Sequence, residues 1–248
     1  MTKHYFDTPR PHLLAHRGLS QHRSGLDENS VQAFIEALNA GCTHIESDVH
    51  ATKDGVAVLF HDDDLDRVAG RALKISELTF SELSAIVLEN GSQVPSLEEV
   101  LASFPDLKIN LDIKSFGGVL PTVAVIERLE AHHRVLVSSF SLRRRKRAIR
   151  LLSRSVATSA SAPEVLALWV SHRLGGIGFG RIASGLDALQ IPLRQGPVNL
   201  SSASFIRRLR KHNLEVHYWT VNDPLLAKQL VDSGATGIVS DRVDLIRF

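Results

Sequence analysis

Glu46 and Asp48 stand two residues apart in an apolar segment of the chain. If that segment is a β-strand, both carboxylates point to one face, because strand side chains alternate. Asp112 and Lys114 repeat this spacing in a second apolar segment. Acids that converge in a buried place raise one another's pKa unless a cation compensates them. Three carboxylates suit a hard divalent cation, Mg²⁺ or Ca²⁺, and a buried ion-pair network without a metal is the alternative interpretation.

Two histidines, His16 and His61, stand where two other apolar segments end. Imidazole can donate or accept a proton near neutral pH, so the pair could supply an acid and a base for cleavage of a phosphodiester. Arg17 and Lys114 could neutralise the phosphoryl oxygens. Asp62 follows His61 directly and is expected to orient or flank it. The chain's other histidines, His22 among them, are expected to be surface or packing residues.

Eight short segments rich in β-forming residues alternate with segments of helical spacing. The expected strands are 12–16, 43–49, 107–114, 134–140, 155–160, 188–192, 215–221 and 237–241. The expected helices are 28–40, 97–104, 119–132, 142–152, 163–171, 201–212 and 224–233. This alternation implies a parallel sheet, and eight repeats in 248 residues imply an α/β fold, the closed (β/α)₈ or TIM barrel. A doubly wound open sheet is the alternative.

The interval from Ala51 to Ser96 is far longer than an ordinary loop between a strand and its helix. It holds a strand-like run of its own, Val56–Phe60. Active sites of (β/α)₈ barrels are built from the loops at the carboxyl ends of the strands. We therefore expect one domain over residues 1–248, in which residues 51–96 form a small insertion, or lid, after the second strand.

Composition argues against several classes of protein. A hydrophobic fraction of 44% with 23% charged residues is typical of a globular domain. The formal net charge of +2 gives no reason to expect nucleic acid or stable membrane insertion, and the basic run Arg143–Arg147 is expected to be solvent-exposed. Cys42 is the single cysteine, and neither a signal peptide nor a membrane span is recognised, so a cytoplasmic location is expected.

Six short motifs occur in order between Leu14 and Asp241. They are His16-Arg17-Gly18, Glu28-Asn29-Ser30, Glu46-x-Asp48, His61-Asp62, Asp112-x-Lys114 and Trp219-Thr220-Val221-Asn222. Together they resemble the glycerophosphodiester phosphodiesterase family. The resemblance implies hydrolysis of a small-molecule glycerophosphodiester to glycerol 3-phosphate and an alcohol, assisted by one divalent metal ion, Mg²⁺ or Ca²⁺.

The resemblance also implies roles for individual residues. By position, the acid/base pair is His16 and His61, the metal ligands are Glu46, Asp48 and Asp112, the phosphate contacts are Arg17 and Lys114, the glycerol contact is Trp219, and the supporting residues are Glu28, Asn29 and Asp62. The family usually has glutamate in place of Asp112, so this carboxylate is withdrawn by one methylene group. The family's usual Asp-Arg-Thr-Thr appears as Asp66-Arg67-Val68-Ala69, which loses two hydroxyl groups.

Two other functions are compatible with the same motifs. A lysophospholipid- or phospholipid-acting phosphodiesterase would keep the core motifs and take a different substrate. A catalytically weak binding protein on this scaffold is a further alternative, suggested by Asp112 and by the lost hydroxyl groups. The nucleophile could be water or the glycerol 2-hydroxyl. The motifs specify neither the alcohol of the substrate nor the oligomeric state.

Overall fold

Eight parallel strands form a barrel in the computed structural model, which describes residues 4–20 and 25–248; His22 lies outside these ranges. The barrel strands are β1 (His12–His16), β2 (His44–Ala51), β6 (Ile109–Ile113), β7 (Val135–Ser138), β8 (Ala157–Thr158), β9 (Ala188–Ile191), β12 (Glu215–Tyr218) and β13 (Gly237–Ser240). Around the barrel their order is β8, β7, β6, β2, β1, β13, β12 and β9. A parallel bridge between Ser159 and Ala188 joins the two end strands. This closure confirms the predicted barrel, and the open-sheet alternative is wrong.

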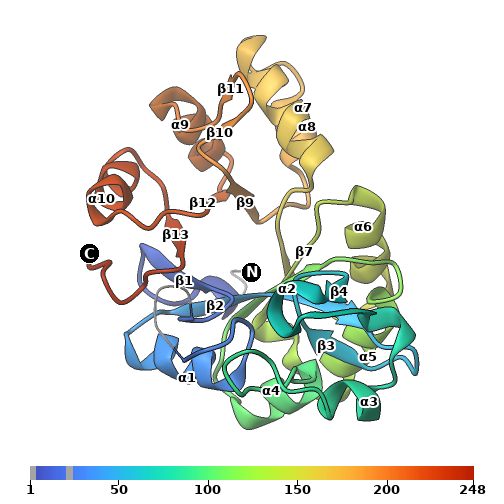
Figure 1. Cartoon of the computed structure of the whole chain (residues 1–248). Helices are drawn as coiled ribbons and strands as arrows, with labels where there is room; N and C mark the ends of the chain where they lie inside the picture. The colour runs from blue at the N-terminus through green and yellow to red at the C-terminus, as the bar shows by residue number, and fades with distance from the viewer. Residues whose placement is uncertain (1–3, 21–24) are drawn as a thin grey trace.

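Helices follow most of the barrel strands and cover the outside (Figure 1). They are α1 (Val31–Asn39), α4 (Leu97–Ser103), α5 (Val119–Arg128), α6 (Leu142–Leu151), α7 (Ala162–Arg173), α8 (Phe179–Ala183), α9 (Ala203–Lys211) and α10 (Pro224–Asp232). α1 begins later than the predicted Glu28 because Ser30 caps it by accepting a hydrogen bond from the Ala33 backbone N–H. None of the helices in the described ranges is long and apolar enough to cross a bilayer.

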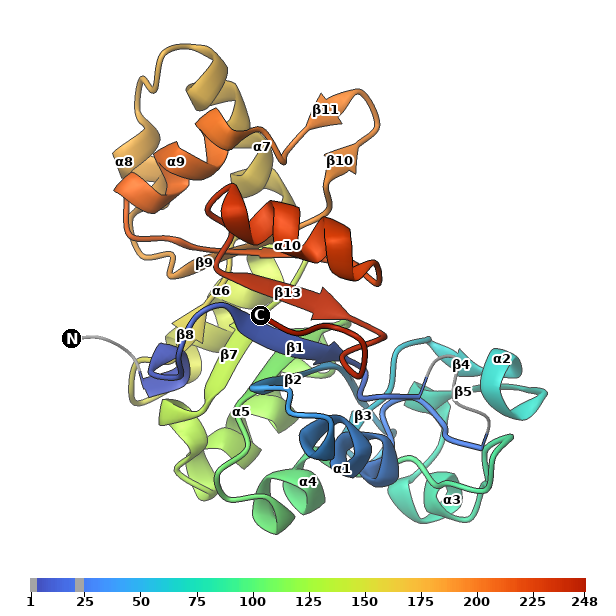
Figure 2. The same cartoon turned by 90° about the vertical axis from the view of Figure 1, so that its left-hand side faces the viewer.

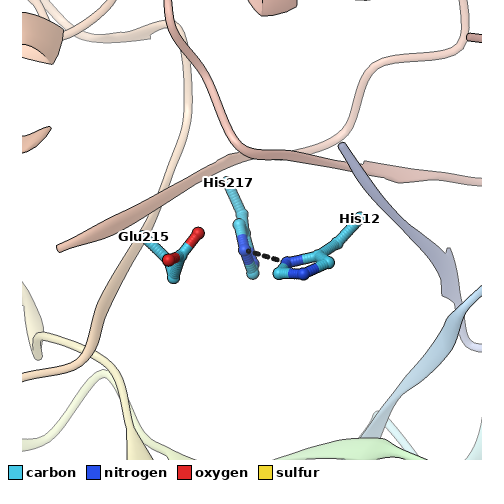
Figure 3. A group of neighbouring side chains, drawn as sticks. All are labelled: His12, Glu215 and His217. Atoms are coloured by element: carbon cyan, nitrogen blue, oxygen red, sulfur yellow. Dashed lines mark hydrogen bonds between the residues drawn. The ribbon is translucent and has the colours of Figure 1, made fainter. Parts of the chain in front are cut away.

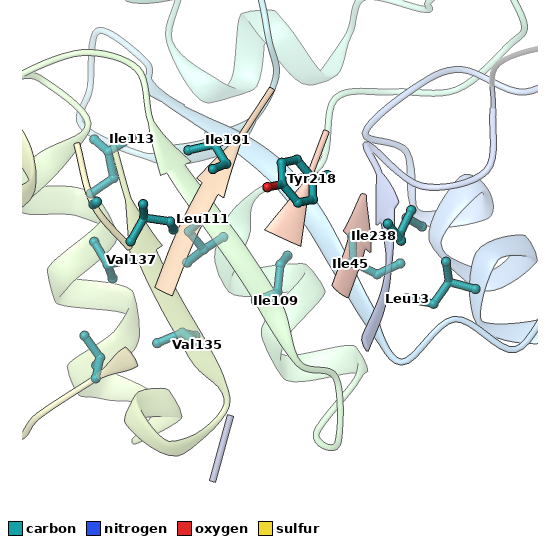
Figure 4. Close-up of a cluster of buried hydrophobic side chains, with 14 of the residues drawn as sticks. Leu13, Ile45, Ile109, Leu111, Ile113, Val135, Val137, Ile191, Tyr218 and Ile238 are labelled. Carbon is teal, nitrogen blue, oxygen red and sulfur yellow. The ribbon is translucent and has the colours of Figure 1, made fainter. Parts of the chain in front are cut away.

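Alternation along the strands separates a hydrophobic layer from a polar interior. On β2, Ile45 and Val49 belong to the main hydrophobic core, while Glu46 and Asp48 face the barrel interior. Figure 4 shows part of the hydrophobic layer, including the buried side chains of Leu13, Ile45, Ile109, Leu111, Ile113, Val135, Val137, Ile191, Tyr218 and Ile238. A slip of one residue in register would exchange the two layers, so the packing of this core fixes which acids face inward.

The segment between β2 and α4, residues 52–96, carries short elements of its own and corresponds to the predicted insertion, except that Ala51 belongs to β2. Its elements are β3 (Ala57–Leu59), β4 (Asp64–Leu65), α2 (Asp66–Ala69), β5 (Arg71–Lys74), η2 (Ile75–Glu77) and α3 (Phe80–Ser84). β3 pairs antiparallel with the end of β2, with Leu59 opposite Val49. A separate hydrophobic cluster, which includes Val58, Leu65 and Leu83, holds the insertion together. The insertion is therefore anchored to the rim by backbone pairing and by its own core.

Several short elements were not predicted from the sequence. They are the 3₁₀ turns η1 (His4–Phe6) and η3 (Ala131–His133), the helix α8, and the antiparallel hairpin of β10 (Arg194–Gln195) and β11 (Val198–Asn199). In Figure 2 the arrows of β1 and β13 point toward the side where β4, β5 and the β10–β11 hairpin lie. The carboxyl ends of the strands, where a barrel builds its site, therefore face the insertion and the hairpin.

Two expectations from the sequence are wrong. β12 ends at Tyr218, so Trp219 lies just beyond the seventh strand and not on it. Arg145, in the middle of the basic run, is buried, and its guanidinium group donates hydrogen bonds to Ser161 and Glu164. The run therefore contains a structural ion pair between α6 and α7 and is not a wholly exposed face.

Candidate active site

Three carboxylates converge inside the barrel. Glu46 and Asp48 point inward from β2, and Asp112 lies opposite Asp48 on the neighbouring strand β6. All three side chains are buried. Lys114, just beyond the end of β6, places its Nζ 2.7 Å from Asp48 Oδ1 and 2.8 Å from Asp112 Oδ2. The structure thus brings together the three residues expected to bind a metal and one expected to contact phosphate.

One oxygen of each carboxylate has no hydrogen-bond partner among the described residues. These oxygens are Glu46 Oε2, Asp48 Oδ2 and Asp112 Oδ1, and all are buried. Arg17 Nε lies 3.3 Å from Asp48 Oδ2 but without hydrogen-bond geometry. A buried acceptor left without a donor costs about 1–3 kcal/mol. Carboxylate oxygens are the ligands that Mg²⁺ and Ca²⁺ take, so the residues present fit a divalent cation.

Crowding shifts the pKa values of these groups. Burial and the charge of Asp48 raise the pKa of Glu46 to about 8, although His16 opposes the shift. Burial also raises the pKa of Asp112, against the effect of Lys114. Burial would lower the pKa of Lys114, but the charges of Asp48 and Asp112 raise it. A cation at the three unpartnered oxygens would oppose these shifts and favour the ionised forms of Glu46 and Asp112.

His16 is held by Asp241, which follows the neighbouring strand β13. His16 Nδ1 lies 2.7 Å from Asp241 Oδ1. Because an ionised carboxylate only accepts hydrogen bonds, Nδ1 carries the proton and Nε2 is left for proton transfer. Asn222 Nδ2 donates to Asp241 Oδ2 at 2.8 Å, and His16 Nε2 lies 3.9 Å from Glu46 Oε2. Burial would lower the pKa of His16, but the hydrogen bond to Asp241 and the charge of Glu46 raise it above its usual value.

His61 is held in the same way by residues of the insertion. Asp62 Oδ1 accepts from His61 Nδ1 at 2.6 Å, and Asp62 Oδ2 accepts from Arg67 Nε at 2.7 Å. Arg67 also donates to both oxygens of Glu28, at 2.6 and 3.2 Å. Glu28 in turn accepts from Arg17 Nη1 at 3.1 Å. This chain of ion pairs joins the insertion to the turn that follows β1.

The turn after β1 depends on glycine. The backbone is left-handed at Arg17 (φ 58°) and at Gly18 (φ 83°). A Cβ on Gly18 would lie 2.8 Å from atoms of Ala33, so no side chain fits between the turn and α1. Asn29 donates its backbone N–H to Arg17 O at 2.9 Å and accepts from Ser47 Oγ at 2.6 Å. Asn29 therefore fixes the turn to β2 and directs Arg17 toward the acids.

A cavity of about 650 Å³ opens over the carboxyl ends of the strands. The predicted site residues that line it are His16, Arg17, Glu46, Asp48, His61, Asp112, Lys114 and Trp219. The Trp219 ring meets the Phe140 ring edge to face, with centroids 5.9 Å apart. The predicted supporting residues Glu28, Asn29 and Asp62 lie behind the lining and contact residues that form it.

A second group of potential metal ligands lies at the opposite end of the barrel. One ligand atom from each of His12, Glu215 and His217 lies within 4.8 Å of the others (Figure 3). His12 Nδ1 and His217 Nε2 are 3.4 Å apart. Glu215, however, forms an ion pair with Arg10, and Arg210 Nη1 lies 3.4 Å from it. Two guanidinium groups beside one carboxylate disfavour a further cation, so this group is a polar network at the floor of the barrel.

A parallel barrel whose carboxyl-end rim carries acids, histidines and basic side chains has the layout of an enzyme that acts on an anionic substrate. The chain matches the model of the Glycerophosphoryl diester phosphodiesterase family over residues 16–245. It belongs to that family and is a phosphodiester hydrolase. The family predicted from the six motifs is confirmed.

Individual relatives agree with this assignment. The chain is 40% identical over 235 residues to the Probable glycerophosphodiester phosphodiesterase 2 of Mycobacterium tuberculosis. This alignment covers 94% of this chain and 88% of that protein. The solved structure of a glycerophosphodiester phosphodiesterase from Thermotoga maritima has a TM-score of 0.71 at 26% identity, covering 94% of this chain and 95% of that chain. An Oleispira antarctica phosphodiesterase, solved with the product sn-glycerol-3-phosphate, shares the fold with a TM-score of 0.74 at 22% identity, covering 96% and 95% of the two chains.

Sequence analysis gave no role to three residues that hold the histidines in place. Asp241 contacts His16, Asn222 contacts Asp241, and Arg67 contacts Asp62. Asn222 belongs to a recognised motif, and Asp241 stands at the carboxyl end of a strand, the position where barrel enzymes carry functional residues. An acid at that position was the available signal for a partner of His16.

Proposed function

We propose that the chain hydrolyses a glycerophosphodiester to glycerol 3-phosphate and an alcohol, with His16 and His61 as its acid/base pair. The observation that carries the proposal is the unpartnered oxygen on each of Glu46, Asp48 and Asp112, beside two histidines on the same cavity. Acid/base groups and a cation-binding cluster in one cavity are what cleavage of a phosphodiester requires.

Glu46, Asp48 and Asp112 would hold one divalent ion, Mg²⁺ or Ca²⁺. When bound, this ion supplies positive charge to the phosphoryl oxygens and favours the charge that develops on them. Arg17 and Lys114 add two fixed positive charges at the same end of the cavity and would contact the phosphoryl oxygens. The proposal treats the shorter Asp112, in place of the family's glutamate, as a metal ligand.

The two histidines would move protons in opposite directions. One takes the proton from the nucleophile and the other gives a proton to the leaving alkoxide. Asp241 stabilises the protonated form of His16 through its hydrogen bond to Nδ1, and Asp62 orients the His61 ring through the same ring atom. Trp219 would pack against the glycerol of the substrate. Residues 51–96 would act as a lid that supplies His61 and closes over this end of the cavity.

Release of glycerol 3-phosphate tests this function. Glycerophosphocholine and glycerophosphoethanolamine are incubated with the wild-type protein and with His16→Ala and His61→Ala, in Mg²⁺, Ca²⁺ or EDTA. We expect turnover in a divalent ion, its loss in EDTA, and a decrease of at least about 100-fold in either variant. His133→Ala, on the exposed surface of η3, is the matched control and should retain turnover. Full activity of both site variants would refute the assigned roles.

A further inference from the structure

The cavity has one charged end and one neutral end. Every charged residue that lines it belongs to the set already described, on the side of β1, β2, β6 and the insertion. The other end lies against α7, the β10–β11 hairpin and the carboxyl ends of β7 and β9. We call it the apolar chamber, and its wall includes Phe140, Pro163, Leu166, Trp169, Val198 and Leu200. None of the described lining residues in the chamber is charged.

The chamber is built by specific contacts. α7 starts with a capping box between Ser161 and Glu164, which fixes the helix end that faces the cavity. Trp169, two turns further along, donates its indole N–H to Asn199 O of β11 at 3.1 Å. Tyr218 donates its hydroxyl to Leu200 O at 2.8 Å. Helix, hairpin and barrel are therefore tied together around the chamber.

The chemistry of the wall selects among ligands. A choline or ethanolamine cation would find no carboxylate in the chamber. The ring of Phe140 already has Lys114 Nζ 5.8 Å from its centroid, which disfavours a second cation beside it. Phe140 and Leu166 are each 56% exposed. Water against such large apolar side chains is unfavourable, and an aliphatic chain that covered them would remove this cost.

We propose that the apolar chamber binds a single acyl chain carried on the glycerol of the substrate, which makes the preferred substrate a lysophospholipid. The proposal rests on the proposed function, because Trp219, the expected glycerol contact, meets Phe140 of the chamber wall edge to face and lines the same cavity as the expected phosphate contacts. In the net hydrolysis the bond from phosphorus to the alcohol oxygen breaks, and water supplies the hydroxyl group that phosphorus gains and the proton that this oxygen takes. The products are an acylglycerol phosphate and the free alcohol.

A chain-length series provides the test. We compare kcat/KM for glycerophosphoethanolamine with that for its butanoyl, hexanoyl and octanoyl lysophospholipids, all as monomers below their micellar concentrations. Each methylene group that enters the chamber should raise kcat/KM by up to about fourfold until the chamber is full. Glycerophospho-N-octanoylethanolamine carries the chain on the leaving alcohol, and we expect no comparable gain. A gain with this compound alone would overturn the placement of the chain on the glycerol.

Two matched variants locate the effect. Leu166→Gln changes a half-exposed residue of the chamber wall, and Leu225→Gln makes the same change on α10, where Leu225 is 73% exposed and outside the cavity lining. In Leu166→Gln the ratio of kcat/KM for the octanoyl substrate to that for the unacylated one should fall by about fivefold. In Leu225→Gln the ratio should stay at the wild-type value. Equal ratios in all three proteins would overturn the assignment of the chamber.

Binding measured without turnover separates this inference from the proposed function. Calorimetry compares octanoylglycerol 3-phosphate with glycerol 3-phosphate on the wild-type protein, and the acylated ligand should bind at least tenfold more tightly, by about 1.4 kcal/mol. Turnover of glycerophosphoethanolamine with no gain from the chain, in rate or in binding, would leave the proposed function standing and refute the acyl chamber. Absence of turnover with every substrate would refute the proposed function, and the inference with it.

Discussion

Asp241→Asn is expected to lower kcat by about 10- to 150-fold while leaving KM nearly unchanged. Asp241 uses both oxygens as acceptors, Oδ1 from His16 and Oδ2 from Asn222. Asn222 cannot reverse its amide, because its Oδ1 accepts from Ser240 Oγ and from the Asp241 backbone N–H. An asparagine at 241 has one acceptor, so one of the two bonds is lost. A hydrogen bond to a charged group contributes about 1.5–3 kcal/mol, which corresponds to the stated range in kcat.

Steady-state release of glycerol 3-phosphate between pH 5 and 9 measures this effect. Because Asp241 raises the pKa of His16, the limb of the kcat profile that reports His16 should move to lower pH in the variant. A purely structural role would not move it. Asp232→Asn, on the surface of α10, is the matched control and should behave as wild type. Wild-type kcat with an unshifted profile in Asp241→Asn would refute the positioning role.

Three further outcomes follow from the geometry. Gly18→Ala should lower the free energy of unfolding by about 2–5 kcal/mol, because of left-handed strain and the clash with Ala33. Gly41→Ala places the same strain in open space and should lower it by only about 1–2 kcal/mol. Urea unfolding at one pH measures both free energies, and equal losses would contradict the clash. Burial lowers the pKa of His44 to about 3. Below pH about 6.5, His44 is therefore protonated in the unfolded chain but stays neutral in the folded chain. His44 should therefore lower the free energy of unfolding by about 1.4 kcal/mol for each pH unit of acidification. Urea unfolding at pH 6 and pH 5 should show a smaller decrease in His44→Gln than in the wild-type protein, and an identical decrease would contradict this account. Arg67→Met breaks the ion pairs that join the insertion to the rim and should lower kcat by about tenfold. Circular dichroism should show an intact fold. An unchanged kcat would show that these ion pairs do not position His61.

The sequence predicted those parts of the site that depend on local spacing. Alternation within one strand places Glu46 beside Asp48, and the same rule pairs Asp112 with Lys114, so both pairs could be recognised without knowing how the strands are ordered. The barrel itself followed from eight repeats of strand and helix. The predicted start of α1 at Glu28 was wrong, because Ser30 caps the helix by accepting a hydrogen bond from the Ala33 backbone N–H.

Other features depend on contacts between distant segments and could not be read locally. His16 meets Asp241 only because closure places β13 next to β1, two strands at opposite ends of the sequence. Arg67 meets Glu28 only because the insertion folds back over the turn after β1. The buried position of Arg145 depends on its ion pair with Glu164 of the next helix, whereas a run of basic residues considered alone indicates exposure.

Metal binding to the three acids tests the central claim most directly. The protein is treated with EDTA, dialysed and titrated with Mg²⁺ and then with Ca²⁺ in a calorimeter, beside Asp48→Asn, and glycerol 3-phosphate release is followed in the same samples. We expect one ion per chain in the wild-type protein, an affinity at least about tenfold lower in Asp48→Asn, and turnover that rises with occupancy. No binding of either ion, together with full turnover in EDTA, would contradict the account, because the unpartnered oxygens of Glu46, Asp48 and Asp112 would then have another purpose.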